Sequence, residues 1–253
     1  MEEAHVALAA EKLIQIGPIP ITNSLLTTWL VTLLLIGFAY LATKNISTVP
    51  RPLQNLAEFL IETFQDLVAT IAGEKTKVFF PIVASFFFFI LFGNYLGLLP
   101  GIGSIGFFLP SEASAKEGVH QVFVPFFRSI NSDLNTTAAL AIVSLITTHI
   151  LAIKYLGLGS YLKKFFSLNP IFLFIGLLEI IGEATKILSL SFRLFGNIFA
   201  GEVLLTTAST RLFAFIIPIP FYFLEILVGF VQALIFAMLT LVFMTILTSK
   251  AEH

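Results

Sequence analysis

The chain contains no cysteine, and only 11% of its 253 residues are charged. The absence of cysteine excludes a disulfide framework, a Cys-ligated metal site and a thiol nucleophile. A soluble domain has about 25% charged residues, so the low charge, together with 57% hydrophobic residues, indicates an integral membrane protein. The net charge of −1 gives no indication of a nucleic-acid partner.

Two sequence signals are also absent. The first twenty residues lack a basic start followed by a short apolar core, so no cleavable signal peptide is expected. The nucleotide-binding pattern GxxxxGK[ST] does not occur, so ATP chemistry is not expected on this chain. The sequence predicts no metal site and no cofactor.

Long hydrophobic runs predict an all-α membrane protein with about five membrane-embedded helices, forming one domain over residues 1–253. One segment differs, because acidic residues recur there every four positions between apolar ones, which predicts an amphipathic helix at the interface. The predicted segments, in chain order, are an external lead (1–23), a helix (24–42), the amphipathic interfacial helix (53–72), a second membrane helix (78–99), an external loop (100–133), a third helix (136–156), and two long helices (170–207 and 221–248).

The length of segment 170–207 carries information of its own. A continuous helix of this length would measure about 57 Å at 1.5 Å per residue, nearly twice the hydrocarbon thickness of a bilayer. Such a helix must tilt strongly, bend or lie across the membrane. We expect it to form an antiparallel hairpin with 221–248 and to pack against a large protein partner.

One arginine, Arg193, lies deep inside this long apolar segment. A guanidinium at bilayer depth costs roughly 3 kcal/mol on insertion scales, and arginine keeps its charge where a buried lysine often loses it. At 100° per residue, Glu179, Lys186 and Asn197 lie on the same helix face as Arg193, and Glu183 is close enough to join them. The segment therefore predicts a functional polar stripe on an apolar helix.

The hairpin brings further polar residues to defined levels. With a turn centred near residue 214, Glu202 and Glu225 lie at one height, and Gln232 lies beside Arg193. Asp133, before the third helix, is interpreted either as a helix N-cap or as a channel-lining acid. Glu179, Glu183 and Lys186 form either an internal ion network or the lining of a channel, and His149 is interpreted first as a helix-packing residue.

The stretch SLSFRLFGNIFAGE (189–202) resembles the signature of subunit a of the F-type ATP synthases, the stator channel of the membrane sector. The resemblance extends to ITNSLLTTW (21–29), SDLNTT (132–137) and QALIFAMLTLVFM (232–244), so it covers most of the chain in order. It implies a subunit that is not itself catalytic toward nucleotides and that translocates ions, most simply protons, against a rotating c-subunit ring.

The resemblance also implies roles for the polar residues. Arg193 corresponds to the essential arginine that meets the ring carboxylate. The resemblance implies that the outer half-channel is lined by Glu202, Glu225, Asn197, Gln232 and Asp133. It implies a place in the cytoplasmic half-channel for Glu179, and we add Glu183 and Lys186 because they lie on the same polar stripe. The implied partners are the c ring, b-type peripheral stalk subunits, the other ATP synthase subunits and the lipid membrane.

The distribution of basic residues predicts the orientation. With five crossings, Lys44, Arg51, Lys75 and Lys77 fall on the same side as Lys154 and the C-terminal end, so the N-terminus is expected outside and the C-terminus in the cytoplasm. The expected location is the plasma (inner) membrane of a bacterium. A secondary transporter that binds an anionic substrate at Arg193 is the alternative, although the two halves show no repeat, and no motif of a membrane-embedded enzyme is found.

Overall fold

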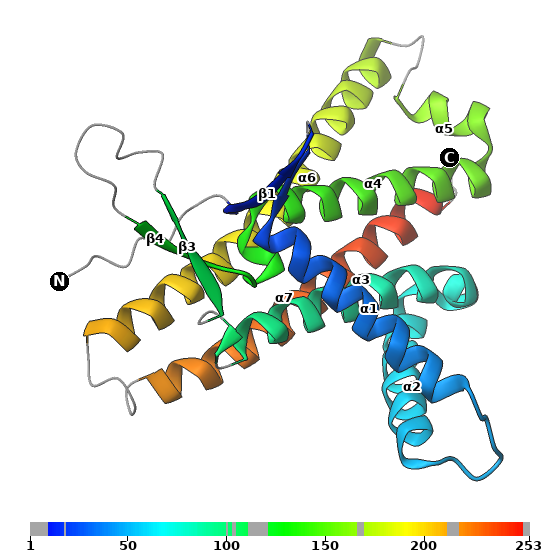
Figure 1. Ribbon diagram of the computed structural model, residues 1–253. Coiled ribbons are helices and arrows are strands. Elements are labelled where there is room, and N and C mark those ends of the chain that lie inside the picture. Colours follow the sequence, from blue (N-terminus) through cyan, green and yellow to red (C-terminus); the bar gives the residue numbers. More distant parts are fainter. Residues whose placement is uncertain are drawn as a thin grey trace. The chain divides into compact units, whose positions relative to one another are not determined.

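The computed structural model describes residues 10–17, 19–99, 101–102, 105–110, 121–165, 170–211 and 218–249 (Figure 1). The chain is divided into two compact units. The first unit comprises Met1–Ile36, Phe89–Thr136 and Phe195–Gln232, and the second comprises Gly37–Phe88, Thr137–Leu194 and Ala233–His253. The chain is predominantly helical, which confirms the prediction of an all-α membrane protein, and each unit is described by itself below.

The first unit contains two small antiparallel β-hairpins that the sequence patterns did not reveal. Strands β1 (Lys12–Ile16) and β2 (Ile19–Thr22) pair before the first helix, with Gly17 at a positive φ of 62° between them. Strands β3 (Gly106–Pro110) and β4 (Gln121–Pro125) pair within the segment expected to be an external loop. All four strands have four or five residues, too few for a period-2 pattern to distinguish them from loops.

Helix α1 (Asn23–Thr43) follows the first hairpin, and α3 (Thr76–Leu98) carries its last ten residues into the first unit. Polar side chains join the segments of this unit. The side-chain amide of Asn94 on α3 donates to the Gly229 carbonyl at 3.0 Å and accepts from the Asn131 amide at 2.7 Å. All three residues are buried, so these hydrogen bonds fix the helices in an apolar setting.

In the second unit, α2 (Pro52–Ala72) continues through a short 3₁₀ turn, η1 (Gly73–Lys75), into α3. Its buried residues lie on one helical face, and its acids Glu62 and Asp66 are exposed, as an amphipathic helix requires. Phe64 on the buried face stacks on Phe87 of α3, with ring centroids 4.5 Å apart. This aromatic contact packs α2 directly on α3.

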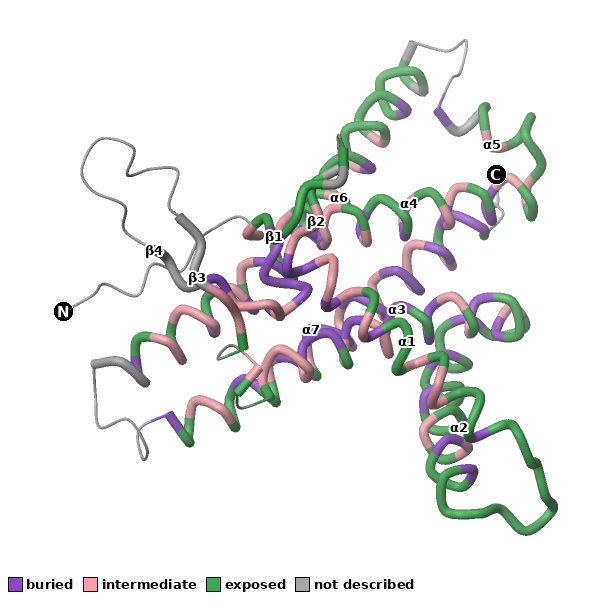
Figure 2. Tube along the Cα trace, viewed as in Figure 1, coloured by how far each residue is buried: buried purple, intermediate pink, exposed green. Residues whose placement is uncertain are grey.

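The remaining elements are η4 (Ile130–Ser132), α4 (Leu134–Leu156), α5 (Leu158–Phe165), α6 (Pro170–Arg211) and α7 (Pro218–Thr248). Four of the described helical stretches are long and apolar enough to cross a membrane: α1, Pro52–Leu98, α4 and α7. The 42-residue α6 is not among them. Much of its surface between residues 171 and 193 is nevertheless apolar and exposed (Figure 2).

Candidate functional site

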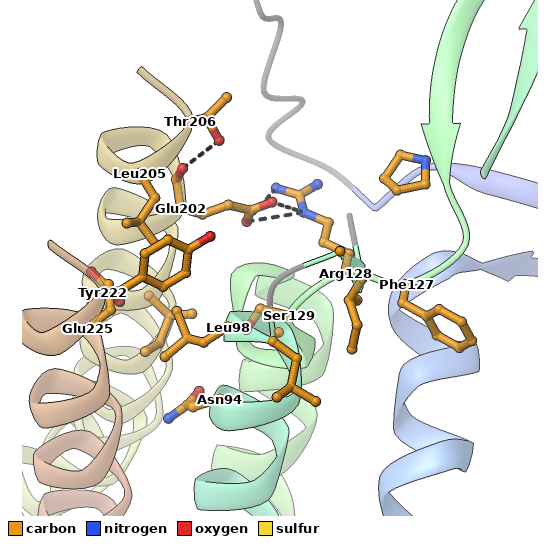
Figure 3. A pocket seen from close by; sticks show the side chains of 16 residues that line it. Asn94, Leu98, Phe127, Arg128, Ser129, Glu202, Leu205, Thr206, Tyr222 and Glu225 are labelled. Atoms are coloured by element: carbon orange, nitrogen blue, oxygen red, sulfur yellow. Dashed lines mark hydrogen bonds and ion pairs between the residues drawn. The ribbon is translucent and has the colours of Figure 1, made fainter. Parts of the chain in front are cut away.

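The first unit holds a cavity of about 490 Å³ between the ends of its helices and the segment that follows β4 (Figure 3). The polar side chains that line it come from four parts of the chain: Asn94 on α3, Arg128 and Ser129 after β4, Glu202 and Thr206 on α6, and Tyr222 and Glu225 on α7. Both carboxylates that the sequence placed at one level of the hairpin therefore line a single cavity. A cavity with a few convergent polar groups is a typical ligand or ion site.

An ion pair closes one side of this cavity. The Arg128 Nε atom donates to both oxygens of Glu202, at 3.1 and 3.3 Å, and Arg128 Nη2 lies 3.3 Å from Oε2. The Arg128 side chain is only 5% exposed, whereas that of Glu202 is 29% exposed. The Arg128 backbone N–H also donates to the Thr27 hydroxyl of α1 at 3.2 Å, which fixes the segment that carries the guanidinium.

Glu225 has different surroundings. It is 4% exposed, and its carboxylate lies directly against Gly201 on α6, so closely that a Cβ atom at that glycine would overlap it. In the part of the chain that the structure describes, no hydrogen bond or ion pair involves this carboxylate. The cavity thus contains one paired and one unpaired carboxyl group.

Glu11, just before β1, is a third acid within electrostatic range of the ion pair. Its backbone carbonyl accepts from the Asn23 N–H at 3.1 Å, which ties the start of the hairpin to the start of α1. Burial raises the pKa of the Glu11 carboxyl, Arg128 lowers it, and Glu202 raises it. The N-terminal hairpin therefore brings a titratable group close to Arg128 and Glu202.

Asp133 does not line this cavity, although it belongs to the same unit. Its Oδ1 atom accepts from the Asn135 backbone N–H at 3.1 Å, and its Oδ2 atom accepts from the Ser24 hydroxyl at 3.0 Å. Asp133 is therefore the N-cap of α4, one of the two interpretations drawn from the sequence. It also joins α4 to the first turn of α1.

Arg193 lies in the second unit, on α6, and its side chain is exposed. The guanidinium Nη2 donates to the Ser189 hydroxyl one turn earlier, at 3.1 Å. Among the described residues no acid pairs with it. Leu188 and Phe192 are also exposed on this stretch of α6, so the positive charge lies on the exposed side of a largely apolar helix. Asn197, one turn further along α6, is exposed as well.

Glu183 forms the centre of a polar cluster in the second unit. Its carboxylate accepts from Lys186 Nζ at 2.8 Å and lies 3.7 Å from His149 Nε2 on α4. The other ring nitrogen of His149, Nδ1, is 2.8 Å from the Tyr161 hydroxyl on α5. Burial, and then the Glu183 and Glu179 carboxylates, raise the pKa of Tyr161, so that its hydroxyl stays neutral. These contacts join Glu183, Lys186, His149 and Tyr161 in one polar cluster. The channel lining inferred for Glu179, Glu183 and Lys186 stays a prediction.

The predicted residues therefore fall into separate groups. Glu202 and Glu225 share the cavity, while Asn197, Gln232 and Asp133 do not line it. Gln232 is buried on α7, and its predicted place beside Arg193 remains a prediction. Sequence reasoning missed Arg128 and Glu11, although an arginine five residues before Asp133, within FFRSINSD, was a visible signal. No cluster of metal-ligating side chains is found within the described ranges.

Comparison with known proteins gives a consistent result. A family model described as ATP synthase A chain matches residues 25–245. ATP synthase subunit a of Syntrophobacter fumaroxidans is 36% identical over 220 residues, covering 85% of this chain and 80% of the relative. ATP synthase subunit a of Moorella thermoacetica is 34% identical over 232 residues, which cover 92% of this chain and 93% of the relative. ATP synthase subunit a 3 of Pelobacter propionicus is 36% identical over 220 residues, which cover 85% of this chain and 83% of the relative.

Proposed function

Because the chain belongs to the family of ATP synthase A chains, we propose that it forms two offset half-channels against a rotating c ring and couples proton flow to ATP synthesis. Proton translocation in the membrane sector is the function of this family, and subunit a is a channel subunit, not a catalytic one. It is a multi-pass membrane protein that associates with other ATP synthase subunits. The comparisons give no support to the secondary transporter considered from the sequence.

The exposed guanidinium of Arg193 is the observation that carries the proposal. A permanent charge on the exposed side of a largely apolar helix is costly in a membrane, and no acid of the described chain pairs with it. A carboxylate on a neighbouring subunit would compensate it. A ring that presents one carboxylate after another would do so repeatedly, and Arg193 would favour the ionised form of each carboxylate as it passes.

The outer half-channel is proposed to run through the cavity of the first unit. A proton arriving from outside would pass Glu202 and Glu225 before it neutralises a ring carboxylate next to Arg193. Asn197 and Gln232 are proposed to lie along this path near the arginine. Asp133 is proposed to contribute near its outer end, where its contacts with α1 and α4 hold the neighbouring segment in place.

The cytoplasmic half-channel is proposed to use the polar stripe of α6. After nearly a full rotation, the ring carboxylate would release its proton past Glu179, with Glu183 and Lys186 providing the polar surroundings. Each proton moved across the membrane contributes roughly 2.3 kcal/mol per 100 mV, so several protons are needed for each ATP. b-type stalk subunits are proposed to hold this subunit still while the ring turns.

The test replaces Arg193 by Ala in the assembled enzyme and measures ATP-driven proton uptake in inverted membrane vesicles. Arg51→Ala, at an exposed arginine before α2 that makes no side-chain capping bond, is the matched control. Arg193→Ala should abolish uptake, and Arg51→Ala should keep it. Wild-type uptake with Arg193→Ala would overturn the proposed function.

A further inference from the structure

Arg128 is the one strongly charged side chain of the cavity to which the proposed half-channels assign no role. Its guanidinium is almost completely buried, and it reaches from the segment after β4 to Glu202 on α6, 74 residues away in sequence. Arginine keeps its charge on burial, so a buried guanidinium needs an anionic partner. Glu202 supplies that partner through contacts from two guanidinium nitrogens.

The two carboxyl groups of the cavity therefore differ in how firmly they are held and in how easily they can exchange a proton. Glu202 is held by Arg128 in one position, and protonation of Glu202 would leave the buried arginine without its counter-charge, which is costly. Glu225 makes no such contact within the described residues, so gaining or losing a proton there breaks no ion pair. Of these two carboxyl groups, Glu225 is the one that is both buried and, among the described residues, unpaired.

We propose that Arg128 is a positioning residue of the outer half-channel, which fixes the Glu202 carboxylate in an ion pair and leaves proton exchange to Glu225. This inference rests on the proposed function and assigns different roles to Glu202, which stays ion-paired, and Glu225, which exchanges protons. The other titratable groups near them are Tyr222, one turn from Glu225 on α7, and Glu11 before β1. The lining also includes the neutral polar side chains of Asn94, Ser129 and Thr206.

The experiment uses inverted vesicles that carry the assembled membrane sector without the catalytic head. Proton uptake is driven by a potassium diffusion potential and followed by a pH-sensitive dye, with the amount of subunit a determined by immunoblot. The variants are Arg128→Gln, Arg128→Lys, Glu202→Gln, Glu225→Gln and the double variant Arg128→Gln/Glu202→Gln. Arg51→Gln is the control for loss of an exposed arginine outside the site.

Arg128→Gln should reduce uptake by about tenfold, because Glu202 loses its partner and is no longer held in place. The double variant should be no worse than Arg128→Gln alone, because no unpaired charge remains, and Arg128→Lys should be intermediate because it keeps the charge without the planar fork. Glu225→Gln should reduce uptake more than Glu202→Gln does.

The dependence of uptake on pH separates positioning from a purely structural role. The pH profile of Arg128→Gln should differ from that of wild type, because Glu202 is then no longer held in an ion pair with a permanent positive charge. The double variant should return toward the wild-type profile, because it has no carboxyl group at position 202. Additive losses in the double variant, or an unchanged profile in Arg128→Gln, would overturn the inference.

Two further comparisons allow a clear conclusion even if one variant fails to assemble. If Arg128→Gln does not assemble, Arg128→Lys and the double variant still provide the comparison, and additivity between Arg128→Lys and Glu202→Gln would count against the ion pair. Arg193→Ala is measured in parallel in inverted vesicles that retain the catalytic head, with ATP as the driving force. Normal pumping in Arg193→Ala defeats the proposed function, whereas normal behaviour of the Arg128 variants alone defeats only this inference.

Discussion

Glu202 and Glu225 are identical side chains in one cavity, and their neighbours make them different. Glu202 faces a buried guanidinium, and Glu225 faces the bare backbone of Gly201. The absence of a side chain at Gly201 leaves the space that the Glu225 carboxylate occupies. This contact is a steric condition on the cavity, independent of charge.

A single methyl group tests that condition. Gly201→Ala would place its Cβ on the Glu225 carboxylate and force it to move, so we expect at least a tenfold loss of proton uptake without loss of the subunit from the membrane. Uptake in vesicles, normalised to the amount of subunit a, is the measurement. Gly196→Ala on the same helix is the matched control, since a Cβ there meets nothing within 4 Å. Equal uptake in the two variants would contradict the prediction.

At the residue scale, the sequence identifies candidate residues only where the information is local. Arg193 stood out because few charges surround it in a long apolar run, and the stripe on its helix follows from spacing alone. Arg128 could not be identified in this way, because its partner Glu202 is distant in sequence and comes close only through folding. Its burial distinguishes it from an ordinary basic residue at a membrane surface.

At the scale of elements, we expect docking of the N-terminal hairpin of β1 and β2 to depend on pH through Glu11. Burial raises the pKa of Glu11, so the docked hairpin binds a proton more tightly than the undocked chain does. Its contribution to docking is present at low pH and is lost as the pH rises through the raised pKa. Glu11→Gln carries no charge at any pH and should remove this dependence.

Hydrogen–deuterium exchange of the peptide covering residues 12–22 measures the effect. Corrected for intrinsic exchange, protection in wild type should fall as the pH rises above the ordinary range of a glutamate, and it should stay level in Glu11→Gln. Glu62→Gln, on the exposed side of α2, should behave as wild type. Identical slopes for Glu11→Gln and wild type would refute the coupling.

A second prediction at this scale concerns the approach of α3 to the segment before α4. A Cβ at Gly97 would lie 2.6 Å from Ser129 Cβ and 2.8 Å from its Cα, so Gly97→Ala must displace backbone. We expect a loss of about 1–3 kcal/mol, typical of overpacking, seen as a lower unfolding midpoint of the complex in detergent. Gly37→Ala on α1, where a Cβ meets nothing within 4 Å, should leave the midpoint unchanged or raised.

Helices and strands could be predicted from the sequence only where the pattern of hydrophobic residues was long enough. Hydrophobic runs of about twenty residues or more identify helices such as α4 and α7 because the signal accumulates over many turns. The strands β3 and β4 pair across residues that no local pattern connects, and each is too short to show alternation. Their hairpin matters for the site, since Arg128 follows β4 by three residues.

At the scale of the whole molecule, the proposed orientation can be tested directly because the chain has no cysteine. Single substitutions Gln15→Cys, Ser47→Cys and Ser160→Cys place a thiol at exposed positions before α1, between α1 and α2, and on α5. A membrane-impermeant maleimide should label Gln15→Cys in right-side-out vesicles and the other two in inverted vesicles. The opposite pattern would reverse the proposed orientation.

The polar cross-links inside each unit have a mechanical consequence. Apolar contacts are non-directional and let packed helices slide, whereas hydrogen bonds resist shear because their geometry is narrow. Asn94 bonded to Gly229 braces α3 against α7 in the first unit, and Lys75 bonded to Thr248 and Ser144 to Thr240 brace α7 in the second. Under the proposed function, a turning ring would push sideways on this subunit at every step. Helices held by hydrogen bonds would deform little under this lateral force, so little energy would be lost in sliding between them. The stiffness of this stationary subunit would then help to determine how much torque reaches the catalytic head.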